Sequence, residues 1–433
     1  MPMLKRQTRH PVRWFVVLAA LAATLVPLAL AATDVSAAAA LLLKKGDRVA
    51  VIGDSITEQK QYSRFIEDYL TVCTPDLDIW TIQLGWGGET AGGFANRMNQ
   101  DLIPFKPNLV TTCYGMNDGG YRAYDDGIGK RYREPMEKIV ETLKKAGATV
   151  VVGSPGCVDV NTWRGPADVY NANLARLRDI ARETAEANGM PFANVHDVLM
   201  DAMKKAKAEY GDKYHVCGGD GVHPSGNGQL AMAYAFLKTL GLDGDIGTIT
   251  LDMNGKPAAT DGHKVLSGEG GKVELESTRY PFCLFGDAKS PDSPRSILPF
   301  LPFNQDLNRL TLVVKNAKAD KVKVAWGNAE KTFTRQDLAK GINLAAEFLD
   351  NPFADAFRKV DGAVAQKQDY ETFLIKECNR TLGGIANRLK DDDEIKAAVK
   401  TIQARLLARH DALAKTVREA VVPVKHTITV TAE

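Results

Sequence analysis

The stretch Val49–Ile56, which reads Val-Ala-Val-Ile-Gly-Asp-Ser-Ile, decides how the rest of the sequence is interpreted. Its first four residues are apolar and mostly β-branched, a pattern typical of a strand buried on both faces. The strand ends at Gly53, because Gly permits a sharp turn and Asp or Ser can start a helix. The pattern places the hydroxyl of Ser55 at the carboxyl end of a strand, where open α/β sheets bind their ligands. Gly-Asp-Ser is also an ordinary capped turn, so the other loops must decide between the two interpretations.

Apolar runs alternate with helical patterns throughout the first half of the chain. The runs are Arg48–Ile52, Ile79–Leu84, Leu109–Tyr114, Thr149–Gly153 and Phe192–His196. The helical patterns cover Tyr62–Val72, Glu89–Leu102, Tyr132–Lys145, Ala167–Asn188 and about Asn227–Leu240. Strands alternating with helices predict a parallel sheet with helices on both faces. Right-handed crossovers bring the strand carboxyl ends to one edge, so the following loops should share one cleft.

Two of these loops are rich in glycine. Gly85–Thr90 contains three glycines, which let backbone amides come close to a ligand, although a flexible turn is the simpler alternative. Gly115–Gly120 offers the side-chain amide of Asn117, but Asn-Asp-Gly-Gly is also common turn chemistry. Both loops can therefore supply hydrogen-bond donors to the predicted cleft.

A third loop, Gly218–Pro224, places Asp220 three residues before His223. The glycine between them lets the carboxylate accept a hydrogen bond from one ring nitrogen, which leaves the other nitrogen free to act as a base. A surface loop that caps the last helix is the alternative. Together with Ser55, these loops supply a nucleophile, an oriented base and oxyanion donors, which is the set that ester cleavage requires.

The four blocks together resemble the SGNH (GDSL-type) hydrolase family. The matching residues are Gly53–Thr57, Gly87–Thr90, Gly115–Asp118 and Asp220–Pro224, and the resemblance covers roughly residues 45–242. It implies a flavodoxin-like three-layer α/β/α fold with a central parallel sheet. It also implies a serine hydrolase that acts on ester bonds and uses no cofactor.

By position, the resemblance assigns Ser55 as nucleophile, His223 as base and Asp220 as the residue that orients the base. It implies an oxyanion hole made of the Ser55 amide, the Gly88 amide and the Asn117 side chain. The family often has Leu after the serine, whereas Ile56 stands here, a variant found in esterase-like branches.

Aromatic and basic residues near the four motif blocks indicate which kind of substrate could bind. Trp86 lies beside the glycine pair, and Trp163 and Arg164 lie in the loop after the fourth strand. Aromatic faces suit sugar rings and arginines suit acidic groups, so these three are candidate substrate-binding residues. Packing of the rings against their own loops is the alternative. The motifs have no long apolar stretch nearby that would form a fatty-acyl tunnel, which favours a short acyl group such as acetyl on a carbohydrate.

The N-terminus has the pattern of an export signal. Met1–Arg13 carries four basic residues, and the apolar run Trp14–Leu30 is followed by small residues. We therefore expect residues 1–37 to be a signal peptide and the protein to be periplasmic or extracellular, with no stable membrane insertion after cleavage. An uncleaved membrane anchor is the alternative, because the run is near the lower limit for spanning a bilayer.

Composition and charge narrow the function classes further. A net charge of +2 over 433 residues gives no electrostatic footprint for nucleic acid. The six cysteines have no metal-binding spacing, and His196 and His215 fit no site either, so no metal is expected. Export would permit disulfides, but the sequence leaves their pairing, and the oligomeric state, open.

After residue 242 the pattern changes. Short alternating runs between Asp245 and Thr334 predict an antiparallel, sandwich-like β module, with Asn254-Gly255 as a hairpin turn. Helical patterns cover Gln336–Asn351, Pro352–Asn379 and Asp391–Val421, and the last two should pair as a hairpin about Gly383-Gly384. Val424–Thr431 alternates again and should return to the β module. We thus expect a hydrolase domain (45–242), a β module (245–334 with 424–432) and a helical insertion (335–421).

These observations predict an exported serine esterase that removes short acyl groups, most simply acetyl, from a small-molecule or carbohydrate ester. A lysophospholipase or thioesterase of the same family is one alternative. A non-catalytic carbohydrate-binding surface protein on a hydrolase fold is another, against which the intact Ser, Gly, Asn, Asp and His argue.

Overall fold

The structure is a computed structural model that describes residues 40–433. The signal peptide expected over residues 1–37 lies outside the described residues. Within the described part of the chain, every helix is too short or too polar to cross a bilayer.

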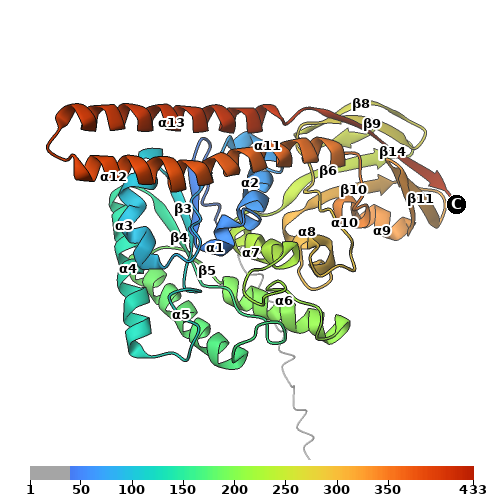
Figure 1. Cartoon of the computed structure of the whole chain (residues 1–433). Coiled ribbons are helices and arrows are strands. Elements are labelled where there is room, and N and C mark those ends of the chain that lie inside the picture. Colours follow the sequence, from blue (N-terminus) through green and yellow to red (C-terminus); the bar gives the residue numbers. More distant parts are fainter. Residues whose placement is uncertain (1–39) are drawn as a thin grey trace, which may run out of the picture. The chain divides into compact units, whose positions relative to one another are not determined.

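A five-stranded parallel sheet organises the first half of the described chain, with the strand order β2-β1-β3-β4-β5. The strands are β1 (Arg48–Gly53), β2 (Trp80–Gln83), β3 (Leu109–Cys113), β4 (Thr149–Gly153) and β5 (Phe192–Ala193). The helices are α1 (Ser55–Glu58), α2 (Tyr62–Val72), α3 (Ala91–Asp101), α4 (Asp126–Lys145), α5 (Ala167–Asn188), α6 (Val195–Tyr210) and α7 (Gly226–Thr239). Figure 1 shows these helices around the sheet. The predicted flavodoxin-like three-layer fold is confirmed.

The two faces of β1 show how the sequence alternation builds these layers. Val49 and Val51 join a core with α2 and α7, whereas Ala50 and Ile52 join a core with α3 and α4 on the other face. Successive strand side chains point to opposite faces, so an uninterrupted apolar run fits a strand that is covered on both sides.

The fifth strand is shorter than the sequence suggests. The apolar run was expected to extend to His196, but β5 ends at Ala193 because Asn194 caps α6. Its side-chain oxygen accepts a hydrogen bond from the amide of Asp197 at 3.2 Å. This capping bond turns the chain into α6.

The second half contains two further sheets, as the predicted sandwich-like module requires, although one of them is not purely antiparallel. The first has the order β13-β10-β6-β7, and the second β12-β11-β14-β9-β8. Their strands are β6 (Asp245–Asp252), β7 (Ala258–Ala259), β8 (His263–Glu269), β9 (Lys272–Ser277), β10 (Arg309–Lys315), β11 (Lys321–Trp326), β12 (Ala329–Thr334), β13 (Ile342–Asn343) and β14 (Val424–Ala432). The second sheet is antiparallel throughout, but β6 and β10 pair in parallel, because the long connection between them carries the chain back to its starting end.

The terminal strand β14 returns to the β module, as its alternation suggested. It lies at the centre of the second sheet, between β11 and β9, and pairs with both in antiparallel register. Its inward residues Ile428 and Val430 are almost fully buried in the core that both sheets share.

Two long helical segments lie antiparallel and side by side along the first half of the described chain (Figure 1). They are α11 (Ala354–Phe373), continued by a π-helical turn η4 (Leu374–Asn379) and α12 (Arg380–Arg388), and α13 (Asp393–Glu419). Three short helices precede them: α8 (Phe303–Leu307), α9 (Arg335–Lys340) and α10 (Leu344–Glu347). The continuous helix expected over Gln336–Asn351 is therefore wrong, since β13 separates α9 from α10.

The hairpin turn also lies elsewhere than expected. Gly383 and Gly384 are inside α12, and the chain turns at residues 389–392, where Asp392 caps α13 by accepting a hydrogen bond from the Ile395 amide at 3.0 Å. A Cβ on Gly383 would come within 2.2 Å of Gln100 Oε1. This glycine thus permits close helix packing rather than a turn.

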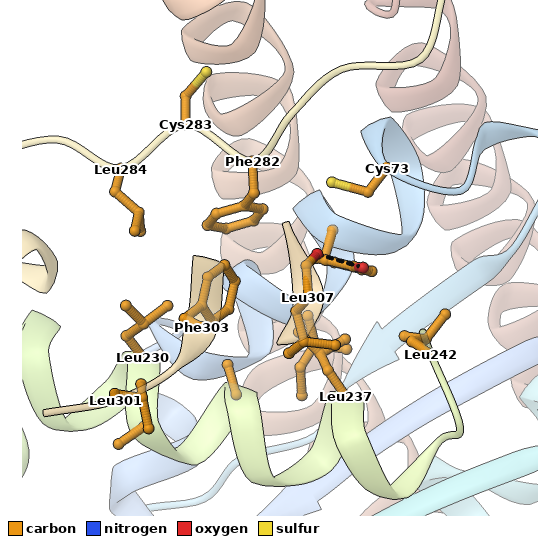
Figure 2. Packing of buried hydrophobic residues seen from close by; sticks show 14 of the residues in the cluster. Cys73, Leu230, Leu237, Leu242, Phe282, Cys283, Leu284, Leu301, Phe303 and Leu307 are labelled. Carbon is orange, nitrogen blue, oxygen red and sulfur yellow. Dashed lines mark hydrogen bonds between the residues drawn. The ribbon is translucent and has the colours of Figure 1, made fainter. Parts of the chain in front are cut away.

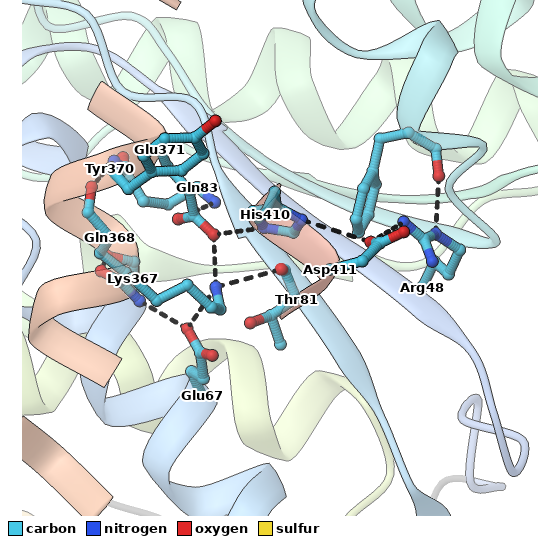
Figure 3. A network of polar contacts seen from close by, with 12 residues as sticks. Arg48, Glu67, Thr81, Gln83, Lys367, Gln368, Tyr370, Glu371, His410 and Asp411 are labelled. Carbon is cyan, nitrogen blue, oxygen red and sulfur yellow. Dashed lines mark hydrogen bonds and ion pairs between the residues drawn. The ribbon is translucent and has the colours of Figure 1, made fainter. Parts of the chain in front are cut away.

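The helical hairpin also covers the open edge of the parallel sheet at β2 (Figure 3). Lys367 Nζ donates to the carbonyl oxygen of Thr81 at 3.1 Å, and Glu371 accepts from the amide of Gln83 at 2.9 Å. Lys367 and Glu371 form a buried ion pair, and His410 Nε2 on α13 lies 2.8 Å from Glu371. Side chains from the hairpin therefore satisfy backbone groups that an edge strand would leave unpaired.

A shared apolar core joins the two halves (Figure 2). Leu230 and Leu237 of α7 pack in the same cluster as Phe282 and Phe303 of the second half. Tyr69 on α2 donates a hydrogen bond to the carbonyl oxygen of Leu307 at 2.7 Å. The described residues consequently form one compact unit.

Candidate active site

Ser55 stands where β1 ends, as the first stretch predicted. Asp54 caps α1 by accepting a hydrogen bond from the Ile56 amide at 2.9 Å. A Cβ on Gly53 would lie 2.8 Å from the carbonyl oxygen of Cys113 on the neighbouring strand. The turn therefore needs glycine at this position, and it leaves the Ser55 side chain half-buried at the edge of the sheet.

The loop before α7 brings His223 and Asp220 to this serine. Ser55 Oγ lies 2.8 Å from His223 Nε2, and His223 Nδ1 lies 2.7 Å from Asp220 Oδ2. If Nδ1–H donates to Asp220, Nε2 is left to accept the proton of the serine hydroxyl. The three side chains thus form the hydrogen-bonded series that the motifs suggested.

The loop geometry depends on Gly221 and on the oxygens of Asp220. Asp220 Oδ1 accepts hydrogen bonds from the amides of Val222 and His223, each at 2.9 Å. Gly221 has a φ of +77°, and a Cβ there would lie 2.3 Å from the amide nitrogen of Trp163. Burial acts to raise the pKa of Asp220, but the two amides and the imidazole outweigh it and lower that pKa. The carboxylate therefore stays ionised near neutral pH.

Two of the three residues expected to donate to an oxyanion, Gly88 and Asn117, lie on neighbouring loops. Gly88 is exposed and has a φ of +72°, in the left-handed region that favours glycine. Asn117 Nδ2 donates to the carbonyl oxygen of Glu89 at 3.0 Å, and Asn117 Oδ1 accepts from the hydroxyl of Tyr121 at 3.1 Å. An amide nitrogen carries two hydrogens, so this contact leaves one for a ligand. The Asn117 side chain also ties its loop to the loop of Gly88.

Three buried acidic groups support these loops. Asp118 accepts hydrogen bonds from the amides of Gly115 and Ala91, each at 3.0 Å, and burial raises its pKa to about 6. Burial also raises the pKa of Asp54 to about 7. Asp118 therefore joins the start of α3 to the loop after β3.

Glu89, the third buried acid, is held by a cation. Arg97 contacts both of its carboxylate oxygens, at 2.6 and 2.7 Å, and Tyr114 donates to it at 3.0 Å. Burial acts to lower the pKa of Arg97, but its hydrogen bonds to Glu89 outweigh that effect and raise the pKa. A buried carboxylate of this kind needs a partner, and the fixed pair anchors the loop that holds Gly88.

The candidate substrate-binding residues fall into two environments. Trp163 packs with Tyr121 and Tyr170, with ring centroids 6.4 and 5.4 Å away, and Arg164 beside it is exposed. Trp86 is half-buried, with Arg97 and a lysine each 5.2 Å from its ring centroid. Trp163 therefore belongs to an aromatic cluster, whereas Trp86 lies between two cationic side chains.

The lysine at Trp86 belongs to the helical hairpin. Lys376 lies in η4 and forms an ion pair with Glu58, three residues after Ser55. A Cβ on Gly87 would lie 2.8 Å from Glu58 Oε2, so this carboxylate packs directly against the glycine loop. The hairpin thus reaches the elements that hold the serine and the oxyanion donors, a contact that the sequence could not show.

His196 and His215, which fit no metal site in the sequence, each lie near an aspartate. His196 Nδ1 lies 2.9 Å from Asp197, and His215 Nε2 lies 3.9 Å from Asp292. Over residues 40–433 no group of three or more His, Cys, Asp or Glu side chains is arranged to hold a metal ion. In the same range all six cysteines are free thiols.

A parallel sheet with a hydrogen-bonded serine, histidine and aspartate at its carboxyl edge is the arrangement typical of α/β hydrolases. Residues 51–231 match the model of the GDSL-like Lipase/Acylhydrolase family. This match agrees with the resemblance to SGNH (GDSL-type) hydrolases and supports a carboxylic ester hydrolase.

Individual relatives are distant. An acetylxylan esterase of Geobacillus stearothermophilus is 22% identical over 220 residues, which are 46% of this chain and 95% of that protein. The solved structure of a gut microbial diltiazem-metabolizing enzyme has a TM-score of 0.68 and 22% identity, and the match covers 90% of this chain and 98% of the other. The latter comparison shows that the fold of both halves occurs together in another protein.

Proposed function

We propose that the protein is an exported serine esterase that hydrolyses short acyl esters, most simply acetyl esters of carbohydrates. The observation that carries this proposal is the series from Ser55 Oγ to His223 Nε2 at 2.8 Å and from His223 Nδ1 to Asp220 at 2.7 Å. A serine hydroxyl becomes a competent nucleophile when a neighbouring base, itself oriented by a third group, can take its proton. Export rests on the signal-like pattern of residues 1–37.

In this mechanism Ser55 Oγ attacks the acyl carbon while His223 Nε2 takes the hydroxyl proton. The tetrahedral oxyanion accepts hydrogen bonds from the amides of Ser55 and Gly88 and from the side chain of Asn117. Collapse breaks the ester bond, and His223 returns the proton to the leaving alcohol. Water then attacks the acyl-serine by the same steps, which releases the carboxylic acid and restores the hydroxyl.

The substrate class is supported by the aromatic group beside the catalytic loop. The backbone of Trp163 packs against Gly221, so the Trp163, Tyr121 and Tyr170 rings are fixed relative to His223. Aromatic rings of this kind bind the apolar faces of sugars. The similarity to an acetylxylan esterase supports the same choice of an acetylated carbohydrate.

Release of acetate from acetylated sugars and xylo-oligosaccharides tests this proposal. We expect the Ser55→Ala variant to lose turnover by at least about 10³-fold while its thermal unfolding stays that of the wild type. Ser225→Ala is the matched control, because Ser225 lies near His223 but its side chain makes no capping hydrogen bond. An active, folded Ser55→Ala protein would refute the assignment of the nucleophile.

A series of p-nitrophenyl esters tests the acyl group separately. We expect kcat/KM to be highest for acetate and to fall as the chain lengthens. Faster hydrolysis of long-chain esters would instead favour a lysophospholipase or thioesterase. It would contradict acetyl esters of carbohydrates as the substrate class.

A further inference from the structure

Tyr121 lies in the loop after β3, four residues beyond the proposed oxyanion donor Asn117. Its hydroxyl donates a hydrogen bond to Asn117 Oδ1 at 3.1 Å. At the other end of the same amide, Asn117 Nδ2 donates to the carbonyl oxygen of Glu89 at 3.0 Å. A side-chain amide turns easily about its last torsion, so contacts at both ends are needed to fix its plane. The two bonds together therefore hold the second Nδ2 hydrogen in one direction.

The backbone at Tyr121 has an unusual conformation. Its φ of +56° lies in the left-handed region, which a bulky residue other than glycine rarely adopts. Such a conformation persists only where surrounding contacts impose it. Asn173, a fully buried residue on α5, supplies them, because its Nδ2 donates to the carbonyl oxygens of Gly119 at 2.9 Å and Arg122 at 2.8 Å. These two carbonyls flank Tyr121, so a buried side chain fixes the turn that brings Tyr121 back to Asn117.

The ring of Tyr121 is fixed as well. It stacks on the ring of Tyr170, with centroids 5.1 Å apart and an angle of 28° between the planes. Tyr170 is fully buried, and its hydroxyl donates to the carbonyl oxygen of Met116, the residue before Asn117. One buried side chain thus holds both the Tyr121 ring and the backbone next to Asn117. Burial raises the pKa of the Tyr121 phenol, so its hydroxyl remains a donor at neutral pH.

We propose that Tyr121 is a positioning residue for ester hydrolysis, which orients the Asn117 amide so that its remaining N–H points at the oxyanion. This inference rests on the proposed esterase function. An oxyanion donor is most effective when it is already in place as the negative charge develops and does not have to turn toward it. The Tyr121 hydroxyl should therefore lower the barrier of the chemical step and leave substrate binding unchanged.

Steady-state kinetics with p-nitrophenyl acetate test the proposal on Tyr121→Phe, which removes the hydroxyl and keeps the stacked ring. Loss of a whole oxyanion donor costs about 10²–10³-fold in kcat, so we expect loss of its orienting hydrogen bond to cost about tenfold, with KM changed by less than about twofold. Tyr124→Phe is the matched control on the same loop. The Arg176 guanidinium lies 5.5 Å from the centroid of the Tyr124 ring, and this variant should keep the wild-type kcat and KM.

A double-mutant cycle with Asn117→Ala separates positioning from direct contact with the substrate. If the Tyr121 hydroxyl acts through Asn117, Tyr121→Phe should change kcat by less than about twofold once Asn117 is alanine. Equal losses in the two backgrounds, or a wild-type kcat in Tyr121→Phe, would each overturn the proposal. Tyr121 is 40% exposed, so the change should leave the fold intact, which thermal unfolding checks. An inactive Ser55→Ala beside a fully active Tyr121→Phe would overturn this inference alone and leave the proposed esterase function standing.

Discussion

Asp54 is a buried acid directly before the proposed nucleophile, and its ionisation should make stability depend on pH. Burial raises its pKa from 3.8 to about 7, although the hydrogen bond from the Ile56 amide opposes this shift. Between about pH 4 and pH 7 the folded state holds a proton that the unfolded state has released. The free energy of unfolding therefore falls as pH rises through this range, by up to about 4 kcal/mol for this group.

The Asp54→Asn variant should remove this part of the pH dependence. The amide oxygen of asparagine still accepts from Ile56, so we expect similar stability to the wild type at pH 4 and greater stability at pH 8. Urea unfolding at both pH values measures the difference. Asp125→Asn is a control of opposite sign, because hydrogen bonding from the Ile128 amide lowers the pKa of Asp125. A wild-type pH slope in Asp54→Asn would contradict the assignment.

Asp220 should act on catalysis through the orientation of His223. We expect Asp220→Asn to lower kcat by roughly 10²-fold with little change in KM, because the amide favours the wrong ring tautomer. The effect should be smaller than for a fully buried aspartate, since the Asp220 side chain is 56% exposed. Steady-state kinetics measure it, with Asp197→Asn, which alters a second Asp–His pair, as the control. Unchanged kcat would exclude this role for Asp220.

Among individual residues, the sequence predicted those in the loops at the carboxyl edge of the sheet. It missed the residues whose contacts arise only when separate elements pack together. Ser55, Asp220 and His223 each lie in a short motif whose place at the sheet edge follows from the alternation of strands and helices. The pairing of Glu89 with Arg97 and Tyr114 joins separate elements, and its only sequence signal is an acidic residue after a glycine pair. The contact of Lys376 with Glu58 spans more than 300 residues and has no local signal.

Among the elements, the hairpin that covers β2 should contribute most to stability. Lys367 is 1% exposed and neutralises two buried carboxylates, Glu67 and Glu371. Replacing it with methionine leaves Glu67 without a cation and Glu371 with only its contact to His410, so we expect Lys367→Met to lower the free energy of unfolding by about 3–5 kcal/mol. Lys323→Met is the matched control, because the Lys323–Glu330 pair is exposed and should change stability by less than about 0.5 kcal/mol. If both variants lose the same stability in denaturant unfolding, Lys367 does not make the expected contribution to the helical hairpin that covers β2.

Whether a segment is a helix or a strand was easier to predict than how the helices and strands are connected and paired. The long helices and alternating strands follow from periodicity, but Gly383 was interpreted as a turn although it permits contact with Gln100. Glycine has no side chain, so it can permit either a turn or the close approach of a neighbouring residue. Only the folded structure shows which of the two applies. The parallel pairing of β6 with β10 was missed for a similar reason, since alternation within a strand carries no information about its direction.

For the whole molecule, the last strand should be essential to the second half. A chain that ends before Val424 leaves β9 and β11 without their shared neighbour and exposes core residues such as Trp326. We expect this truncation to give insoluble protein, whereas removal of only the exposed residues 431–433 should be tolerated. Soluble yield and thermal unfolding distinguish the two truncated chains. A soluble truncated protein with wild-type unfolding would show that β14 is dispensable.

The central position of β14 also sets an order of events during synthesis. The strands of the parallel sheet emerge from the ribosome first. The strands β9 and β11 lack their shared neighbour until β14 is translated, about 100 residues after β11. A chaperone or translocation machine that meets the nascent chain therefore meets two unpaired strand edges, and the β module can close only after residue 432 has been added.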